Sequence, residues 1–151
     1  MEHIVKYSEQ RKENVFSFTD ICFRELGKVF EPEGRHSFYN DIDREFDSFW
    51  CLVSTNRVVG TVAVKKIDES TAELKALYLL SEYRGKGFGF QLLDKAVKFA
   101  KERGYQRIVL DSMSQYEDAL RLYERYGFKK TERYNDNPYA DVFMEYQLLD
   151  R

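Results

Sequence analysis

The chain has few of the residues on which metal sites and disulfide frameworks depend. Its 151 residues include two cysteines and two histidines. Cys22 and Cys51 form no metal-binding spacing and are too few for a disulfide framework. Both cysteines have apolar neighbours, which is typical of buried, reduced thiols. Because His3 and His36 are far apart and have no cysteine close by in sequence, we predict that the protein binds no metal.

Long apolar runs are also missing. The longest have five residues, as in 49–53 and 76–80, whereas a membrane-spanning helix needs about 20. The first residues contain no apolar stretch of signal-peptide length. We therefore expect a soluble, cytoplasmic protein that has no membrane partner.

An excess of positive charge is missing as well. The chain has 24 basic and 26 acidic residues, for a net charge of −2, so we expect no nucleic-acid partner. It contains two prolines, and no linker, repeat or low-complexity tract interrupts it. Hydrophobic residues make up 43% and aromatic residues 16% of the chain, which excludes wholesale disorder. The length therefore predicts a single domain over residues 1–151.

The hydrophobic pattern alternates between the periods of strands and helices and predicts a mixed α/β fold. The predicted order is β-α-α-β-β-β-α-β-α-β-β. The strands are expected at 3–7, 49–54, 58–66, 72–80, 107–111, 128–134 and 141–149. The helices are expected at 13–28, 36–45, 87–103 and from a capping box at 114–117 to Gly127. The three central strands are joined by short turns, which indicates an antiparallel meander.

Alternation along 72–80 assigns one set of side chains to a single face of the predicted strand. The members of that set are Ala72, Leu74, Ala76, Tyr78 and Leu80.

A glycine-rich loop follows this strand and leads directly into a helix. It contains Arg84, Gly85, Lys86, Gly87, Phe88 and Gly89. Glycine lets backbone amides converge, and a helix N-terminus adds unpaired N–H groups, so the loop is suited to bind a pyrophosphate. It is not a Walker loop, and Phe90 stands where a dinucleotide-binding loop needs its third glycine. The structural alternative is a turn that serves only close packing of strand and helix.

Two motifs together resemble one family. Arg84, Gly87 and Gly89 match R-x-x-G-x-G, the acetyl-CoA pyrophosphate motif of the GNAT superfamily of N-acetyltransferases. Residues 119–128 resemble the A-x-x-L-Y-x-x-x-G-F block of the same superfamily, and the element order matches its fold over nearly the whole chain. The resemblance implies a central, mostly antiparallel, twisted sheet of about seven strands flanked by about four helices.

The resemblance also implies an activity, in which a primary amine of a small molecule or a protein attacks acetyl-CoA directly. No acyl-enzyme and no metal are implied. Backbone of Leu77, Tyr78 and Leu79 would hold the pantetheine arm, with the Leu79 N–H as the main candidate donor to the thioester oxygen. The loop from Arg84 to Gly89 would hold the pyrophosphate.

The resemblance places three further cofactor contacts at the start of the second motif. They are Ser114, Tyr116 and Ala119. Many members of the superfamily have an asparagine that contacts pantetheine where this chain has Tyr116. With a tyrosine at this position, Ser114 or Gln115 would substitute for the asparagine.

For catalysis, the resemblance indicates Tyr123 as the acid that protonates the leaving thiolate, and position on the strand suggests Glu73 as the base. The alternatives are that Tyr123 is a core aromatic and that Glu73 is a solvated strand carboxylate, with water or another group as the base. The acceptor wall would come from the segment between the first two helices and from the last hairpin. Its candidates are Glu31, Glu33, Tyr39, Asp41, Tyr134, Asn135 and Asn137.

Two functions of other classes compete with this one. A non-catalytic acyl-CoA-binding sensor would use the same loop but would need no acid at Tyr123. A nucleotide-binding regulatory domain is disfavoured by the absent fingerprints. Members of the superfamily often dimerise, and the sequence leaves homodimerisation open.

Overall fold

The computed structural model describes residues 1–149, so the last two positions of the expected domain lie outside the described residues. Within 1–149, seven strands form one open sheet with the order β1-β2-β3-β4-β5-β7-β6. The strands are β1 (Glu2–Lys6), β2 (Ser48–Ser54), β3 (Arg57–Lys66), β4 (Thr71–Leu79), β5 (Arg107–Ser112), β6 (Lys129–Lys130) and β7 (Val142–Gln147). The α-helices are α1 (Lys12–Glu25), α2 (Ile42–Glu45), α3 (Phe88–Glu102) and α4 (Glu117–Tyr126), with short 3₁₀ turns η1 (Glu9–Arg11), η2 (Ser37–Asp41) and η3 (Ser81–Tyr83).

The sheet is antiparallel at every strand pair except one. Strands β2, β3 and β4 form the expected meander, and Thr55 and Asn56 both have positive φ in the two-residue turn between β2 and β3. That backbone geometry matches the twist of the flanking strands. Only β4 and β5 run parallel, because α3 connects them. The predicted mixed, mostly antiparallel fold is therefore confirmed.

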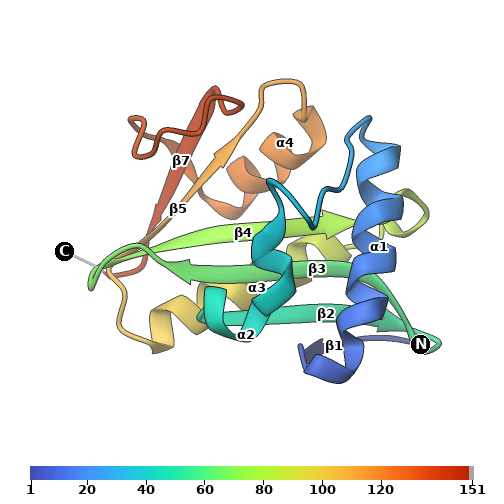
Figure 1. The fold of residues 1–151 in the computed structure, drawn as a ribbon. Helices are drawn as coiled ribbons and strands as arrows, with labels where there is room; N and C mark the ends of the chain where they lie inside the picture. Colours follow the sequence, from blue (N-terminus) through green and yellow to red (C-terminus); the bar gives the residue numbers. More distant parts are fainter. Residues whose placement is uncertain (150–151) are drawn as a thin grey trace.

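Helices cover both faces of the sheet. In Figure 1, α1 and α2 lie in front of it and α3 lies behind it. The Trp50 ring of β2 packs against Phe99 of α3, with 5.1 Å between ring centroids. On the other face, Tyr78 of β4 packs against Phe23 of α1, with a centroid distance of 5.0 Å. Burial of these apolar side chains between the layers forms the core.

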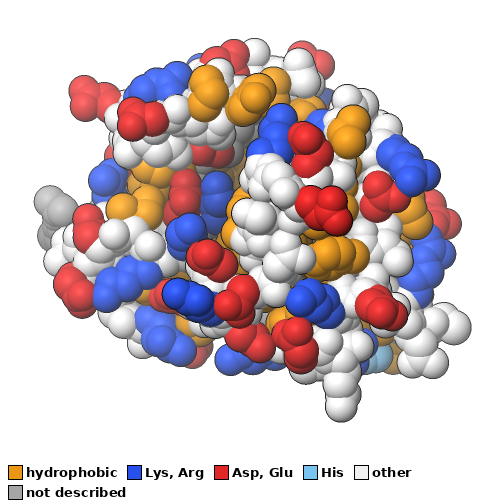
Figure 2. Space-filling view, in the orientation of Figure 1, with side chains coloured by type: hydrophobic (Ala, Val, Ile, Leu, Met, Phe, Trp, Pro, Cys, Tyr) orange, Lys and Arg blue, Asp and Glu red, His pale blue; other side chains and the backbone are white. Residues whose placement is uncertain are grey.

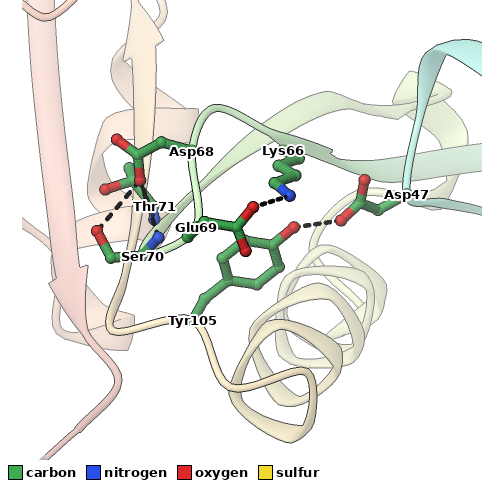
Figure 3. Close-up of polar contacts among 7 residues, drawn as sticks. All are labelled: Asp47, Lys66, Asp68, Glu69, Ser70, Thr71 and Tyr105. Atoms are coloured by element: carbon green, nitrogen blue, oxygen red, sulfur yellow. Dashed lines mark hydrogen bonds and ion pairs between the residues drawn. The ribbon is translucent and has the colours of Figure 1, made fainter.

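Polar contacts fix the turn between β3 and β4. Figure 3 shows one carboxylate oxygen of Asp68 accepting the backbone N–H groups of Ser70 and Thr71, at 2.9 and 2.8 Å. The Tyr105 hydroxyl, just after α3, donates to the carboxylate of Asp47. The backbone N–H groups of Gln106 and Arg107 donate to the Ser70 carbonyl, at 2.8 and 3.2 Å, and hold the start of β5 beside the start of β4.

Several expected boundaries are wrong at the ends of elements. The first helix ends at Glu25 rather than at residue 28, because Gly27 takes a left-handed conformation with φ of +73°. The second expected helix is mostly the 3₁₀ turn η2, in which the Asn40 amide bonds the Pro32 and Ser37 carbonyls.

The expected capping box at 114–117 is also wrong. Helix α4 begins at Glu117, and the Ser114 hydroxyl and N–H both donate to the carboxylate of Asp141, each at 2.8 Å. Strand β6 is confined to Lys129–Lys130, because the Arg133 guanidinium binds three carbonyls and folds the following segment into a loop.

Candidate active site

Strands β4 and β5 separate after three residue pairs. Thr71 pairs with Arg107, and the last pair is Glu73 with Val109. Beyond it, β4 continues to Leu79 and β5 to Ser112 without pairing to one another in the described chain. Figure 1 shows β5 diverging from β4, which leaves a free strand edge on β4. An unpaired edge is a template for one more strand-like partner.

The hydrogen-bond alternation of β4 shows which backbone groups face this free edge. The Leu80 N–H donates to the Val59 carbonyl across the β3 side, at 3.0 Å. Neighbouring residues of a strand direct their backbone N–H and C=O groups to opposite sides. The backbone groups of Leu79 therefore face away from β3, and by the same alternation those of Leu77 do too. The Leu79 carbonyl accordingly accepts from the Arg84 Nε at 3.3 Å.

A β-bulge in β4 changes the face on which its last side chains lie. Thr61 is opposite Tyr78 and Ala63 is opposite Lys75, so Ala76 and Leu77 are together opposite one residue of β3. Ala76 has φ of +54°, and its carbonyl accepts the Thr61 hydroxyl at 2.6 Å. The extra residue reverses the alternation beyond it.

The bulge overturns the expected placement of Tyr78 with Ala72 and Leu74. Tyr78 lies on the α1 face against Phe23, whereas Leu79 lies on the α3 face, where it and Leu92 approach Gly60. Burial raises the pKa of Tyr78, as do the charges that Tyr39, Tyr123, Cys22 and Tyr116 would carry if ionised.

The glycine-rich loop lies between the end of β4 and α3. Gly85 and Gly87 have φ of +77° and +89°, and an added Cβ at either would meet nothing within 4 Å. Glycine is thus required there by backbone conformation, while the space above the loop is open. Gly87 precedes α3, whose first N-terminal hydrogen bond comes from Gln91. The amides of Phe88, Gly89 and Phe90 consequently have no acceptor within the helix and can bind an anion.

Glycine is needed at the third position of the motif for close packing rather than for backbone conformation. A Cβ on Gly89 would lie 3.3 Å from Leu122 of α4, so this glycine lets α3 and α4 approach closely. Arg84 and Lys86 are exposed beside the loop, and Lys86 lies over the ring of Tyr83. The predicted loop residues are therefore brought together, with two cations next to the free amides.

Tyr123 is buried on α4, with 7% of its surface exposed. Burial raises the pKa of its hydroxyl, and the negative charge of Asp111 raises it further. Among the described residues no hydrogen bond engages this hydroxyl. Tyr126, one turn later, donates to Asp94 at 2.7 Å, as a structural tyrosine does. The contrast leaves the Tyr123 hydroxyl free for a partner from outside the chain.

Glu73 is buried where the two strands separate. It is 7% exposed, so the alternative of a solvated carboxylate is wrong. One of its oxygens accepts the Tyr134 hydroxyl at 2.6 Å and the Asn135 amide at 3.5 Å. The Lys75 ammonium lies 3.9 Å from the same oxygen. The loop after β6 supplies two of these donors, which places Tyr134 and Asn135 beside Glu73.

A second carboxylate, Asp111 on β5, shares the same loop. It accepts the amides of Asn135 at 2.7 Å and Asn137 at 3.3 Å. Asn135 therefore bridges the carboxylates of two diverging strands. The sequence predicted Tyr134, Asn135 and Asn137 as acceptor-wall candidates, but it contained no signal for Asp111.

The remaining predicted residues are three cofactor contacts and four candidates for the acceptor wall. Ser114 is engaged by Asp141, and its bonds lower the pKa of that carboxyl group. Ala119 packs partly buried against the core, and Tyr116 is the residue before α4. Tyr39 is 2% exposed in the core, so its placement in the acceptor wall is wrong. Glu31, Glu33 and Asp41 are exposed.

The face that carries α1 and α2 has charges of both signs. Figure 2 shows acidic and basic side chains interspersed over it, and the surface is hollowed between the side of α1 and α2 and the side of β5 and β7. In the described part of the chain no helix is long and apolar enough to cross a membrane, and no cluster of side chains could hold a metal ion.

Known sequences similar to this chain are N-acetyltransferases. Residues 13–128 match the model of the acetyltransferase (GNAT) family. YsnE of Bacillus subtilis, an uncharacterized N-acetyltransferase, is 32% identical over 150 residues, which cover 95% of this chain and 99% of YsnE. Human N-acetyltransferase 8B is 38% identical over 88 residues, 55% of this chain. The matched region spans 39% of that human protein.

Solved structures share the fold. A GNAT-family acetyltransferase of Staphylococcus aureus Mu50 has a TM-score of 0.89 at 21% identity, covering 99% of this chain and 100% of its own. The acetyltransferase yncA of Salmonella typhimurium, solved with its cofactor acetyl-CoA, has a TM-score of 0.78 at 18% identity. It covers 100% of this chain and 96% of its own.

Proposed function

Because the chain belongs to the GNAT acetyltransferase family, we propose that it transfers the acetyl group of acetyl-CoA to a primary amine of a small molecule or a protein by direct attack. When bound, acetyl-CoA supplies an acetyl group activated as a thioester. The observation that carries the proposal is the free edge of β4, which leads directly into the glycine-rich loop at the start of α3. The buried Tyr123, whose hydroxyl has no hydrogen bond among the described residues, supports it.

The loop after β4 binds the pyrophosphate. The open space above Gly85 and Gly87 fits a phosphate, and the free amides at the start of α3 point their partial positive charge toward it. Arg84 and Lys86 add cationic charge. From this anchor, the pantetheine arm runs along the free edge as an added strand would.

The same edge binds the thioester oxygen. The N–H groups of Leu77 and Leu79 both face away from β3, so each is oriented as a donor. A preorganised donor of this kind stabilises developing negative charge by about 3 kcal/mol. Because the backbone acts, the leucine side chains have no part in this step.

Tyr123 protonates the sulfur as the carbon–sulfur bond breaks. A free phenol has a pKa of about 10 and a thiol about 8.5, so full transfer to a thiolate is uphill by roughly 2 kcal/mol. Burial and Asp111 raise the pKa of Tyr123 and keep it protonated. The hydroxyl therefore acts best as a hydrogen-bond donor whose proton moves only as charge develops on sulfur.

Glu73 accepts the proton of the amine through water. Glu73 lies four positions before Leu77 along β4, which corresponds to about 13 Å between Cα atoms in a regular strand, so a water molecule relays the proton from the amine to the carboxylate. A lysine-like amine with a pKa of about 10.4 costs roughly 4.6 kcal/mol to deprotonate at pH 7, and an α-amine near 7.7 costs about 1 kcal/mol. The need for Glu73 thus depends on the acceptor.

A thiol-release assay tests the proposal. The protein is mixed with acetyl-CoA and a panel of primary amines, and free CoA and acetylated amine are measured together. We expect CoA release that depends on the amine and equals the acetylated product. Saturable binding of acetyl-CoA with no amine-dependent release would contradict the proposal and favour a non-catalytic sensor.

A further inference from the structure

The end of α1 places a lysine over an aromatic ring. Gly27 and Lys28 close the helix in a Schellman motif, in which the Lys28 N–H donates to the Phe23 carbonyl at 2.8 Å and the Gly27 N–H to the Arg24 carbonyl at 3.1 Å. The motif fixes the backbone of Lys28 next to the last turn of the helix. Its side chain folds back so that Nζ lies 4.6 Å from the centroid of the Phe23 ring.

Two more rings complete the surroundings of this ammonium. Nζ of Lys28 lies 5.4 Å from the centroid of Tyr78 and 5.7 Å from that of Tyr116. We call Phe23, Tyr78 and Tyr116 the aromatic box. Its members come from α1, from the end of β4 and from the residue before α4. Aromatic rings at such distances attract alkylammonium groups.

The box holds its occupant without a counter-charge. In the part of the chain that the structure describes, no carboxylate lies within ion-pair distance of Lys28. Burial and the charge of Arg35 lower the pKa of Lys28. Arg35 itself lies over the ring of Tyr139, 4.4 Å from its centroid. Ring faces thus hold an ammonium in the box, while burial and the charge of Arg35 ease the loss of its proton. The neutral amine that results is the form that can attack a carbonyl.

The position of the box matches that of an acceptor. Tyr78 lies between Leu77 and Leu79, whose N–H groups face the free edge of β4. Because of the bulge, its side chain lies on the α1 face of the sheet. An amine against Tyr78 therefore lies beside the groups assigned to the thioester.

We propose that the aromatic box is the acceptor subsite for a primary alkylamine and that Lys28 occupies it as a pseudosubstrate until an acceptor displaces it. This inference rests on the proposed function. In the reaction, the nitrogen of the displacing amine forms a bond to the acetyl carbon, the carbon–sulfur bond breaks, and sulfur leaves as CoA thiol. The amine gives up one proton to water or Glu73, and Tyr123 supplies the proton to sulfur.

Removing the occupant provides the test. Lys28→Ala deletes the atoms of n-propylamine from the box, so n-propylamine is the probe. Its binding is measured by NMR titration without acetyl-CoA, in wild type, in Lys28→Ala and in Lys28→Arg, which keeps a cation in place. Lys95→Ala is the matched control, because Lys95 is exposed on α3 behind the sheet. Thermal unfolding and acetyl-CoA affinity establish that each variant is folded.

The expected result is saturable binding at least about tenfold tighter in Lys28→Ala than in wild type, Lys28→Arg or Lys95→Ala. Adding Tyr116→Leu to Lys28→Ala should remove about tenfold of that affinity. Lys28→Ala should also acetylate n-propylamine at least about tenfold faster than wild type at subsaturating amine. Equal binding in wild type and Lys28→Ala, or no binding in a folded Lys28→Ala, would overturn the inference.

Two further outcomes separate this inference from the proposed function. If n-propylamine binds to Lys28→Ala but is not acetylated, while wild type acetylates other amines, the box is not the acceptor subsite and the proposed function stands. If wild type shows no amine-dependent CoA release with any amine of the panel, the proposed function fails, and the acceptor assignment fails with it.

Discussion

Replacing Tyr123 by phenylalanine separates catalysis from stability. The hydroxyl of Tyr123 is engaged by no hydrogen bond among residues 1–149, and the ring is buried. Its loss therefore removes no hydrogen bond within the described residues, and we expect the free energy of unfolding to change by less than about 0.5 kcal/mol. A general acid contributes about 10²- to 10⁴-fold in rate. Turnover should fall by that factor, while the affinity for acetyl-CoA, measured by calorimetry, stays within about twofold.

Tyr126→Phe is the matched control, with the opposite expectation. Its hydroxyl donates to Asp94 at 2.7 Å, and Asp94 also pairs with Lys98. Losing a bond to a charged group should cost about 1.5 kcal/mol of stability, which lowers the melting temperature by roughly 3–6 °C. Turnover should not change. If Tyr123→Phe keeps near wild-type turnover, or if both variants lose activity equally, Tyr123 is a core residue and the assigned role is refuted.

The remaining predictions concern the loop and the base. Gly87→Val should weaken acetyl-CoA binding at least about tenfold by calorimetry, because a side chain at φ of +89° distorts the backbone amides of the loop. Gly104→Val is the control, since Gly104 has φ of +88° after the end of α3. It should lower stability but leave the affinity for acetyl-CoA unchanged. Equal affinity in both variants would remove the anion-binding argument. Glu73→Gln should keep acetyl-CoA affinity and shift the rising limb of the pH–rate profile toward the pKa of the amine, with the largest loss at low pH, because only the neutral amine attacks. A profile that superimposes on wild type at every pH would mean that Glu73 takes no proton.

Local signals in the sequence predicted the order of elements and the anion-binding loop. Alternating polarity marks strands wherever a face is buried, and the loop needs its glycines at Gly85 and Gly87 for reasons of backbone conformation alone. Gly127 likewise ends α4 as expected. Such features depend on a few neighbouring residues, so a single sequence contains them.

Structural features that depend on residues far apart in the sequence could not be predicted from such local signals. The bulge at Ala76 arises from pairing with β3 and from the Thr61 hydroxyl, and nothing near residue 76 predicts a positive φ for alanine. Glu73 is buried because a loop some 60 residues later folds over it. Lys28 was missed because the helix was expected to include it, whereas Gly27 ends the helix and turns the lysine toward Tyr78.

The central claim is that an amine takes the acetyl group directly from CoA at the free edge of β4. Its most direct test is a rapid-quench time course in which CoA, the acetylated amine and the acetylation state of Cys22 and Cys51 are measured in the same samples. We predict that CoA and acetylated amine appear together from the first turnover, that both slow in Tyr123→Phe, and that neither cysteine is acetylated. CoA release that precedes the amine product, with acetyl bound to a cysteine, would contradict direct attack.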